Sequence, residues 1–136
     1  MNRVALVVGV SGITGSNLAE ELVKQDWTTY GLARNPHVSI DGLRPVAADL
    51  LSPEGLSAAL ADTAPTHVFF TSWMRMETEA ENIRVNAAMV RNLLNALSPK
   101  RSVQHVALVT GLKHYLGPFE AYAKEGFLPE TPLREE

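Results

Sequence analysis

Two hydrophobic patterns alternate along the chain: short apolar runs typical of buried strands, and longer stretches in which apolar residues recur at helical spacing. Strands are predicted at residues 4–8, 28–33, 43–48, 67–71 and 103–110. Helices are predicted at 14–25, from Ser52 to just before Pro65, and at 78–97. Ser52 is expected to cap the second helix. The third helix is expected to bury one stripe, made of Ile83, Ala87, Val90, Leu94 and Leu97.

This alternation of strands and helices predicts parallel strands joined by right-handed crossovers. The expected fold is an α/β, Rossmann-type three-layer sandwich with a parallel sheet of about five strands, in one domain over residues 1–136. Residues 111–136 are rich in Gly and Pro and are expected to form an irregular tail. The last strand would lie at an edge of the sheet, and its unpaired apolar edge predicts self-association or a homodimer.

Composition argues against several classes of function. The net charge of −3 leaves no basic footprint for nucleic acid. With no cysteine, the chain has no disulfide, thiolate metal site or cysteine nucleophile, which fits a reducing, cytoplasmic location. The four histidines lack the close pairing of metal ligands, so no metal is expected. The apolar stretch at 4–10 is too short to cross a membrane, which takes about 20 residues.

Three glycines, Gly9, Gly12 and Gly15, stand at three-residue spacing between the first predicted strand and the first predicted helix. Glycines let such a turn tighten and let a diphosphate approach main-chain N–H groups, while the positive end of the helix dipole faces the phosphates. The flanking strand and helix favour a dinucleotide-binding turn over an ordinary glycine-containing β-to-α turn. The cofactor-binding residues predicted here are Gly9, Ser11, Gly12, Ile13, Thr14 and Gly15.

The second predicted strand ends in GLARNP, where the adenosine ribose of a dinucleotide would lie. An acidic residue there would accept hydrogen bonds from the 2′-hydroxyl of NAD, whereas the guanidinium of Arg34 suits a 2′-phosphate. The sequence therefore favours NADP (NADPH), with a solvated loop arginine as the alternative. Asp49 is predicted to hydrogen-bond the adenine, with a turn-forming aspartate as the alternative. Its neighbour Leu50 is included among the cofactor-binding residues.

Small polar residues and a tryptophan end the fourth predicted strand: Thr71, Ser72 and Trp73. Ligands of open α/β sheets bind at the carboxyl ends of the strands, so all three are predicted to contact the cofactor. Trp73 either walls the nicotinamide or substrate pocket or packs under a loop. Asn86 lies one helical turn from Asn82 and either contacts the ligand or ties backbone groups near this edge.

The fifth predicted strand leads into TGLKHY, which brings Thr110 and Lys113 to the same edge. A lysine there could hold the nicotinamide ribose or supply positive charge where an oxyanion develops, and a solvated loop lysine is the alternative. The Tyr-x-x-x-Lys pattern of many dehydrogenases is absent, since no tyrosine is followed by lysine four residues later.

Several segments together resemble the progesterone 5β-reductase and iridoid synthase group of the atypical extended short-chain dehydrogenase/reductases, which are epimerase/dehydratase-like. The matching segments, between residues 3 and 122, are GVSGITG, GLARNP, FFTSW, ENIRVNAAMVRNLLNAL and TGLKHYLGPFEAY. The resemblance implies an NADPH-dependent reductase of the C=C bond of α,β-unsaturated carbonyl compounds, with an enone as small-molecule substrate. It makes Lys113 the counterpart of the lysine that stabilises the enolate oxygen.

The chain also departs from this group. Its members are more than twice as long, and their catalytic tyrosine lies beyond the point equivalent to Glu136. Tyr115 and Tyr122 match non-catalytic positions. Three alternatives therefore stay open: the cofactor-binding part of a reductase, an NADP-binding module or sensor without chemistry, and a fragment that self-associates.

Overall fold

A computed structural model describes residues 2–111 of the chain. Its centre is one five-stranded sheet with the strand order β3-β2-β1-β4-β5, in which all four neighbouring pairs are parallel. The strands are β1 (Val4–Val8), β2 (Thr28–Ala33), β3 (Arg44–Ala47), β4 (His67–Phe70) and β5 (His105–Leu108). The predicted parallel sheet and its five strands are confirmed, and β3, β4 and β5 are shorter than expected.

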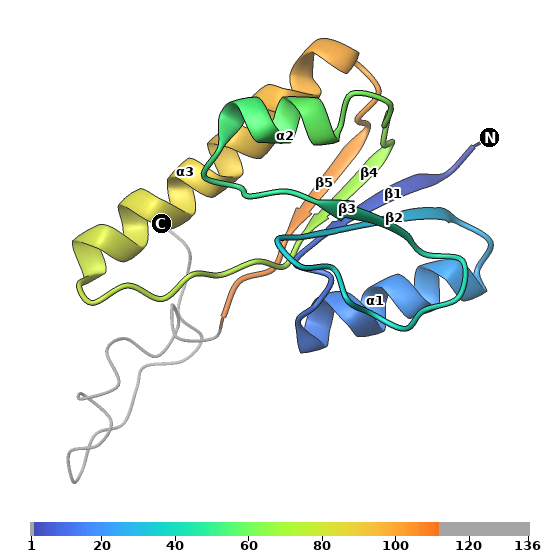
Figure 1. Cartoon of the computed structure of the whole chain (residues 1–136), viewed down its shortest axis with the longest axis horizontal. Helices are drawn as coiled ribbons and strands as arrows, with labels where there is room; N and C mark the ends of the chain where they lie inside the picture. Colours follow the sequence, from blue (N-terminus) through green and yellow to red (C-terminus); the bar gives the residue numbers. More distant parts are fainter. Residues whose placement is uncertain (1, 112–136) are drawn as a thin grey trace, which may run out of the picture.

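Helices cover both faces of the sheet, which completes the predicted three layers (Figure 1). One face carries α1 (Ile13–Lys24), and the other carries α2 (Pro53–Ala59) and α3 (Glu79–Leu97), which ends in a short 3₁₀ turn at Ser98–Lys100. The β2–β3 connection has no helix. Its apolar residues pack beside α1 instead, and they are Val38, Ile40 and Leu43.

Polar caps fix where α2 and α3 begin. The Ser52 side chain accepts a hydrogen bond from the Gly55 N–H at 3.3 Å, with Pro53 in the first helical position. Thr78 caps α3 in the same way, at 3.2 Å from the Glu81 N–H. The cap at Ser52 is therefore confirmed. The predicted end of α2 near Pro65 is wrong, because the helix stops at Ala59 and non-helical backbone follows.

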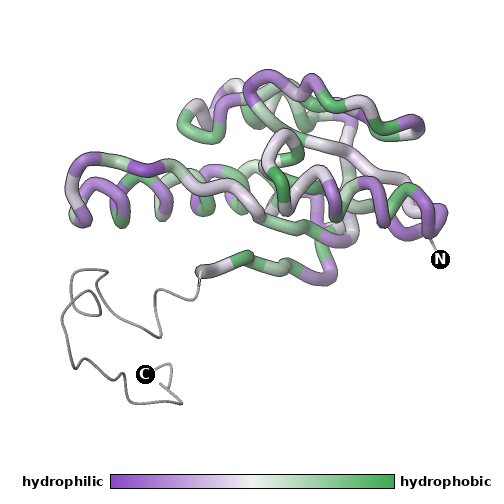
Figure 2. Tube along the Cα trace, turned by 90° about the horizontal axis from the view of Figure 1, so that it is seen from below, coloured by the Kyte–Doolittle hydropathy of each residue, from purple (hydrophilic) through white to green (hydrophobic). Residues whose placement is uncertain are grey.

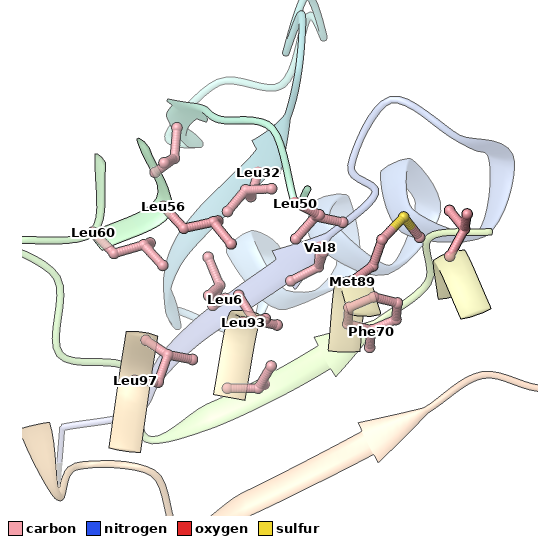
Figure 3. Close-up of a cluster of buried hydrophobic side chains, with 13 residues drawn as sticks. Leu6, Val8, Leu32, Leu50, Leu56, Leu60, Phe70, Met89, Leu93 and Leu97 are labelled. Atoms are coloured by element: carbon pink, nitrogen blue, oxygen red, sulfur yellow. The ribbon is translucent and has the colours of Figure 1, made fainter. Parts of the chain in front are cut away.

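Alternate residues of the central strand supply both halves of the core. Leu6 and Val8 of β1 face α2 and α3, in the larger cluster drawn in Figure 3. Ala5 and Val7 face α1. A strand covered on both faces has no solvent side to fill with polar residues, which explains why β1 reads VALVV.

The buried stripe of α3 differs from the predicted one. Ile83 is 65% exposed and Leu94 39% exposed, and of the five predicted residues only Leu97 is fully buried. The buried residues are Val85, Met89, Leu93 and Leu97. Apolar residues occupy so much of this helix that two neighbouring stripes share helical spacing, and only packing against the sheet and α2 selects between them.

β5 lies at one edge of the sheet, as predicted (Figure 2). Its register with β4 pairs Val68 with Val106 and Phe70 with Leu108. Val106 and Leu108 remain 44% and 55% exposed, and Val109 just beyond the strand is 51% exposed. The described residues therefore leave an apolar strand edge uncovered.

Candidate functional site

The turn after β1 needs glycine at its first position. Gly9 has φ +91°, a conformation that side chains with a Cβ rarely adopt, and its N–H donates to the Leu32 carbonyl at 2.9 Å. A Cβ on Gly9 would lie 2.7 Å from the Ser72 Oγ. The turn is thereby pressed against the end of β4.

Gly15 is required by packing. A Cβ on this residue would lie 2.1 Å from the Gly9 carbonyl oxygen and 2.8 Å from the Thr71 Oγ1. The Thr71 hydroxyl donates to the Val8 carbonyl at 2.7 Å, which joins the ends of β1 and β4. The start of α1 can sit this close to the two strand ends only because position 15 has no side chain.

Gly12 has no such internal reason to be glycine. Its backbone is ordinary, with φ −81° and ψ 168°, and a Cβ there would meet its nearest neighbour, the Gly9 oxygen, at 3.5 Å. Neither conformation nor packing excludes a side chain. Gly12 lines the open cleft described below, so what its missing side chain provides is access to the backbone.

The helix that follows offers unpaired donors to this space. Gly12 is the N-cap of α1 and supplies no side-chain cap, and the first turn contains no acidic residue. The N–H groups of Ile13, Thr14 and Gly15 have no partner within the helix, because the first intrahelical bond joins Ser16 to the Gly12 carbonyl at 2.9 Å. These donors and the helix dipole favour an anion.

A cleft of about 270 Å³ opens at the carboxyl edge of the sheet, next to this turn. It runs from the glycine turn past the ends of β2 and β3 to the segment after β4. Nine residues predicted from the sequence line it: Gly9, Ser11, Gly12, Arg34, Asp49, Leu50, Thr71, Ser72 and Trp73. Residues from four separate parts of the chain therefore meet in one place.

The other predicted residues that the structure describes do not line the cleft itself. Ile13, Thr14 and Gly15 form the first turn of α1 rather than the cleft wall, with Ile13 86% exposed. Thr110 is exposed two residues beyond β5. Lys113 lies outside the described residues.

Asn86 does not line the cleft, because its side chain is bound to backbone. Its Oδ1 accepts from the Met74 N–H at 2.9 Å, and its Nδ2 donates to the Met74 carbonyl at 2.8 Å. This is the backbone-tying alternative stated above. Sequence reasoning missed five residues that also line the cleft: Leu32, Ala33, Ala48, Met74 and Met89. Met74 follows directly from Trp73 and could have been included, whereas Met89 required knowledge of the true buried stripe of α3.

Two charged residues of the cleft differ in how they are engaged. The Arg34 side chain is exposed, and no carboxylate of residues 2–111 forms an ion pair with it. The Asp49 Oδ1 accepts from the Leu51 N–H at 2.9 Å, so this aspartate does form a turn. Arg34 is therefore available to an anionic ligand, and Asp49 has one carboxylate oxygen already in use.

A second hollow, of about 370 Å³, opens at the opposite edge of the sheet and is lined by Asn2, Arg3, Trp27, His67 and Gln104. It is larger, but it lies at the amino ends of the strands, where open α/β sheets do not bind their ligands. The candidate site is therefore the cleft at the carboxyl edge.

Residues 2–111 contain neither a metal-binding cluster nor a helix that could span a membrane. In this range, His, Asp and Glu side chains nowhere gather in the threes that could hold a metal ion. The helices in the same range lack the combination of length and apolar character that crossing a bilayer requires.

Known proteins resemble this chain in both sequence and structure. The (S)-8-oxocitronellyl enol synthase of Camptotheca acuminata is 41% identical over 131 residues, which cover 89% of this chain and 34% of that enzyme. The 3-oxo-Delta(4,5)-steroid 5-beta-reductase of Arabidopsis thaliana is 41% identical over 126 residues, which cover 85% and 32%. The chain thus spans about a third of the length of the curated relatives it matches.

Among solved structures, a short-chain dehydrogenase/reductase superfamily protein of Agrobacterium tumefaciens with bound NAD is 25% identical, with a TM-score of 0.69. The match covers 93% of this chain and 37% of that one. The model of the NAD dependent epimerase/dehydratase family matches residues 5–132, nearly the whole chain. The glycine turn, the parallel sheet and these matches agree: the chain belongs to the NAD dependent epimerase/dehydratase family.

Proposed function

We propose that the chain is the cofactor-binding part of an NADPH-dependent reductase that acts on the C=C bond of α,β-unsaturated carbonyl compounds. Gly12 is the main support for cofactor binding. The fold itself does not require glycine at this position, and Gly12 lines a cleft beside the free N–H groups of α1. The reaction class is supported by the names of the relatives, an oxocitronellyl enol synthase and a steroid 5-beta-reductase.

The dinucleotide would lie along the cleft at the carboxyl edge. The amides of Ile13, Thr14 and Gly15, with Gly9, Ser11 and Gly12, would hold the diphosphate. Asp49 and Leu50 would border the adenine. Thr71, Ser72 and Trp73 would border the nicotinamide, with Thr110 beyond them.

Arg34 would make the site prefer NADPH to NADH. Arg34 directly follows β2 and lines the cleft, and its side chain has no ion-pair partner among residues 2–111. A 2′-phosphate would give it two charge-assisted hydrogen bonds that a 2′-hydroxyl cannot.

Calorimetric titration with NADPH and NADH tests this preference. NADPH should bind more tightly, and Arg34→Ala should bring the two affinities together. Arg44→Ala is the matched control, because Arg44 is an exposed arginine on β3 that stacks over Tyr30 at 5.6 Å and does not line the cleft. Equal affinities of the unchanged protein for the two cofactors would remove Arg34 from the account.

Lys113 would supply positive charge to the enolate oxygen that forms when NADPH provides hydride to the β-carbon of the enone. Turnover of small enones, followed by NADPH consumption and falling sharply in Lys113→Ala, would support this role. Tight NADPH binding with no turnover would instead identify a binding module without chemistry.

Self-association through β5 is part of the same proposal. The exposed side chains of Val106 and Leu108, next to a strand edge that no strand of residues 2–111 pairs with, support pairing with a second copy of the chain. Light scattering should show an assembly that Leu108→Lys dissociates. Ile83→Lys, on the exposed side of α3, should leave it intact. A strictly monomeric protein at high concentration would contradict this part.

A further inference from the structure

Asparagines of α3 hold the segment that follows β4. The Asn86 side chain uses both of its polar atoms on this segment: Oδ1 accepts from the Met74 N–H at 2.9 Å and Nδ2 donates to the Met74 carbonyl at 2.8 Å. Asn82, one turn earlier, accepts from the Met76 N–H at 2.6 Å. Three backbone groups within three residues are therefore satisfied by side chains of one helix.

This segment forms one wall of the cleft. Trp73 and Met74 both line it, and Trp73 is 66% exposed. Few packing contacts can hold so exposed a ring in place, so the position of its backbone depends on the hydrogen bonds of the next residue. Asn86 therefore acts directly on the part of the chain that carries Trp73.

A third asparagine of α3 holds the opposite wall. The Asn92 Nδ2 donates to the Leu50 carbonyl at 2.9 Å, between residues 42 positions apart in sequence. Leu50 lines the cleft between β3 and α2 and is 8% exposed. One helix thus reaches backbone on both sides of the same opening.

We infer that Asn86 and Asn92 are positioning residues, and that α3 sets the distance between the two walls of the cleft before any ligand binds. An amide is required at Asn86 because the site presents a donor and acceptors together, namely the Met74 N–H and the carbonyls of Met74 and Asn82. The inference rests on the proposed function only in taking the ligand of this cleft to be a dinucleotide.

The first test needs no ligand. The chain has two tryptophans, so Trp27→Phe leaves Trp73 as the only indole reporter. In this background Asn86→Ala should lower the fluorescence anisotropy of Trp73 and increase its quenching by acrylamide. Asn86→Asp should behave like the alanine variant despite its matched size, because a carboxylate cannot donate to the two carbonyls. Asn95→Ala, at an exposed position of the same helix, is the control and should change neither signal.

The second test separates the two walls by NADPH titration. Asn86→Ala and Asn92→Ala should each weaken binding about tenfold or more, because Asn92 loses its one hydrogen bond to the cleft wall and Asn86 loses two. Asn92→Ala should do so with Trp73 anisotropy unchanged, because it acts on the other wall. A variant that is partly unfolded would change both its NADPH affinity and its Trp73 anisotropy. Thermal melting of each variant identifies that case.

Unchanged anisotropy and quenching of Trp73 in both Asn86 variants would overturn the inference for the wall that carries Trp73. The same conclusion would follow if Asn86→Asp behaved like the unchanged protein. Unchanged NADPH affinity in Asn92→Ala would overturn it for the other wall. If Asn86→Ala fails to fold, Asn86→Asp and Asn92→Ala decide. If the unchanged protein binds no NADPH, the proposed function fails, while the fluorescence test still decides whether Asn86 positions Trp73.

Discussion

Replacing Gly12 with alanine separates folding from binding more cleanly than any other change in the glycine turn. Gly12 has φ −81° and ψ 168°, which alanine adopts without strain. The added methyl would meet the Gly9 carbonyl oxygen at 3.5 Å, an ordinary contact distance, and would otherwise project into open space. The folded chain therefore has room for the substitution.

The effect on stability is small because two terms oppose each other. Removing a glycine from the unfolded chain stabilises the fold by about 0.4–1 kcal/mol where the native conformation is compatible. Alanine is a poorer N-cap than glycine, which costs about 0.5–1 kcal/mol. The net change in the free energy of unfolding should stay below about 1 kcal/mol.

The effect on binding is large, because the methyl group would occupy the space through which a diphosphate reaches the backbone. Losing one charge-assisted hydrogen bond costs about 1.5–3 kcal/mol, which corresponds to roughly ten- to hundredfold in Kd. Urea denaturation measures the first quantity, and calorimetric titration with NADPH measures the second. Unchanged NADPH affinity in a stable Gly12→Ala protein would show that Gly12 does not give a diphosphate access to the backbone.

Gly15→Ala is the contrasting variant. Its Cβ would lie 2.1 Å from the Gly9 carbonyl oxygen, so the turn or the helix must move. A backbone clash of this size should lower the free energy of unfolding by about 3 kcal/mol or more. If Gly12→Ala were the more destabilising of the two, the assignment of these glycines to access and to packing would be reversed.

Three further changes in the free energy of unfolding can be measured by urea denaturation. Ser52→Ala should cost about 0.5–2 kcal/mol through loss of the α2 cap. Ser57→Ala, at an exposed position of the same helix, should cost nothing, and equal effects would mean that the cap does not stabilise the protein. Leu93→Ala should cost about 2–5 kcal/mol and Leu94→Ala far less. The reverse order would mean that α3 buries the stripe predicted from the sequence. Thr71→Val should cost about 0.5–1.5 kcal/mol by losing its 2.7 Å bond to the end of β1, and no loss would mean that the bond is dispensable.

The strands and the glycine turn could be predicted from sequence because local patterns determine them. β1 has nowhere to place a polar residue, since both of its faces are covered, and Ser52 followed by proline marks a helix start by local chemistry. Most residues that line the cleft could also be predicted from the sequence. The carboxyl ends of parallel strands must share one edge, so Arg34, Asp49 and Thr71 were expected to lie near one another.

Features that depend on packing between distant segments could not be predicted in the same way. Two apolar stripes of α3 have the same spacing, and only contact with the sheet and α2 buries Met89 and Leu93 rather than Ile83. The bond from Asn92 to the Leu50 carbonyl joins residues 42 positions apart, and nothing in the local sequence of either residue indicates it. The three glycines of the turn also look alike in the sequence. Only the space around each Cβ position shows that they have different roles.

The central claim is that the backbone N–H groups at the start of α1 bind a diphosphate. Titration of the ¹⁵N-labelled protein with NADPH, followed by amide NMR, tests it residue by residue. Saturable shifts are expected for the amides of Gly12, Ile13, Thr14 and Gly15, together with shifts of the amides of residues that line the cleft. If NADPH binds while these amides keep their positions, or if none of them shifts at saturating NADPH, the claim is wrong.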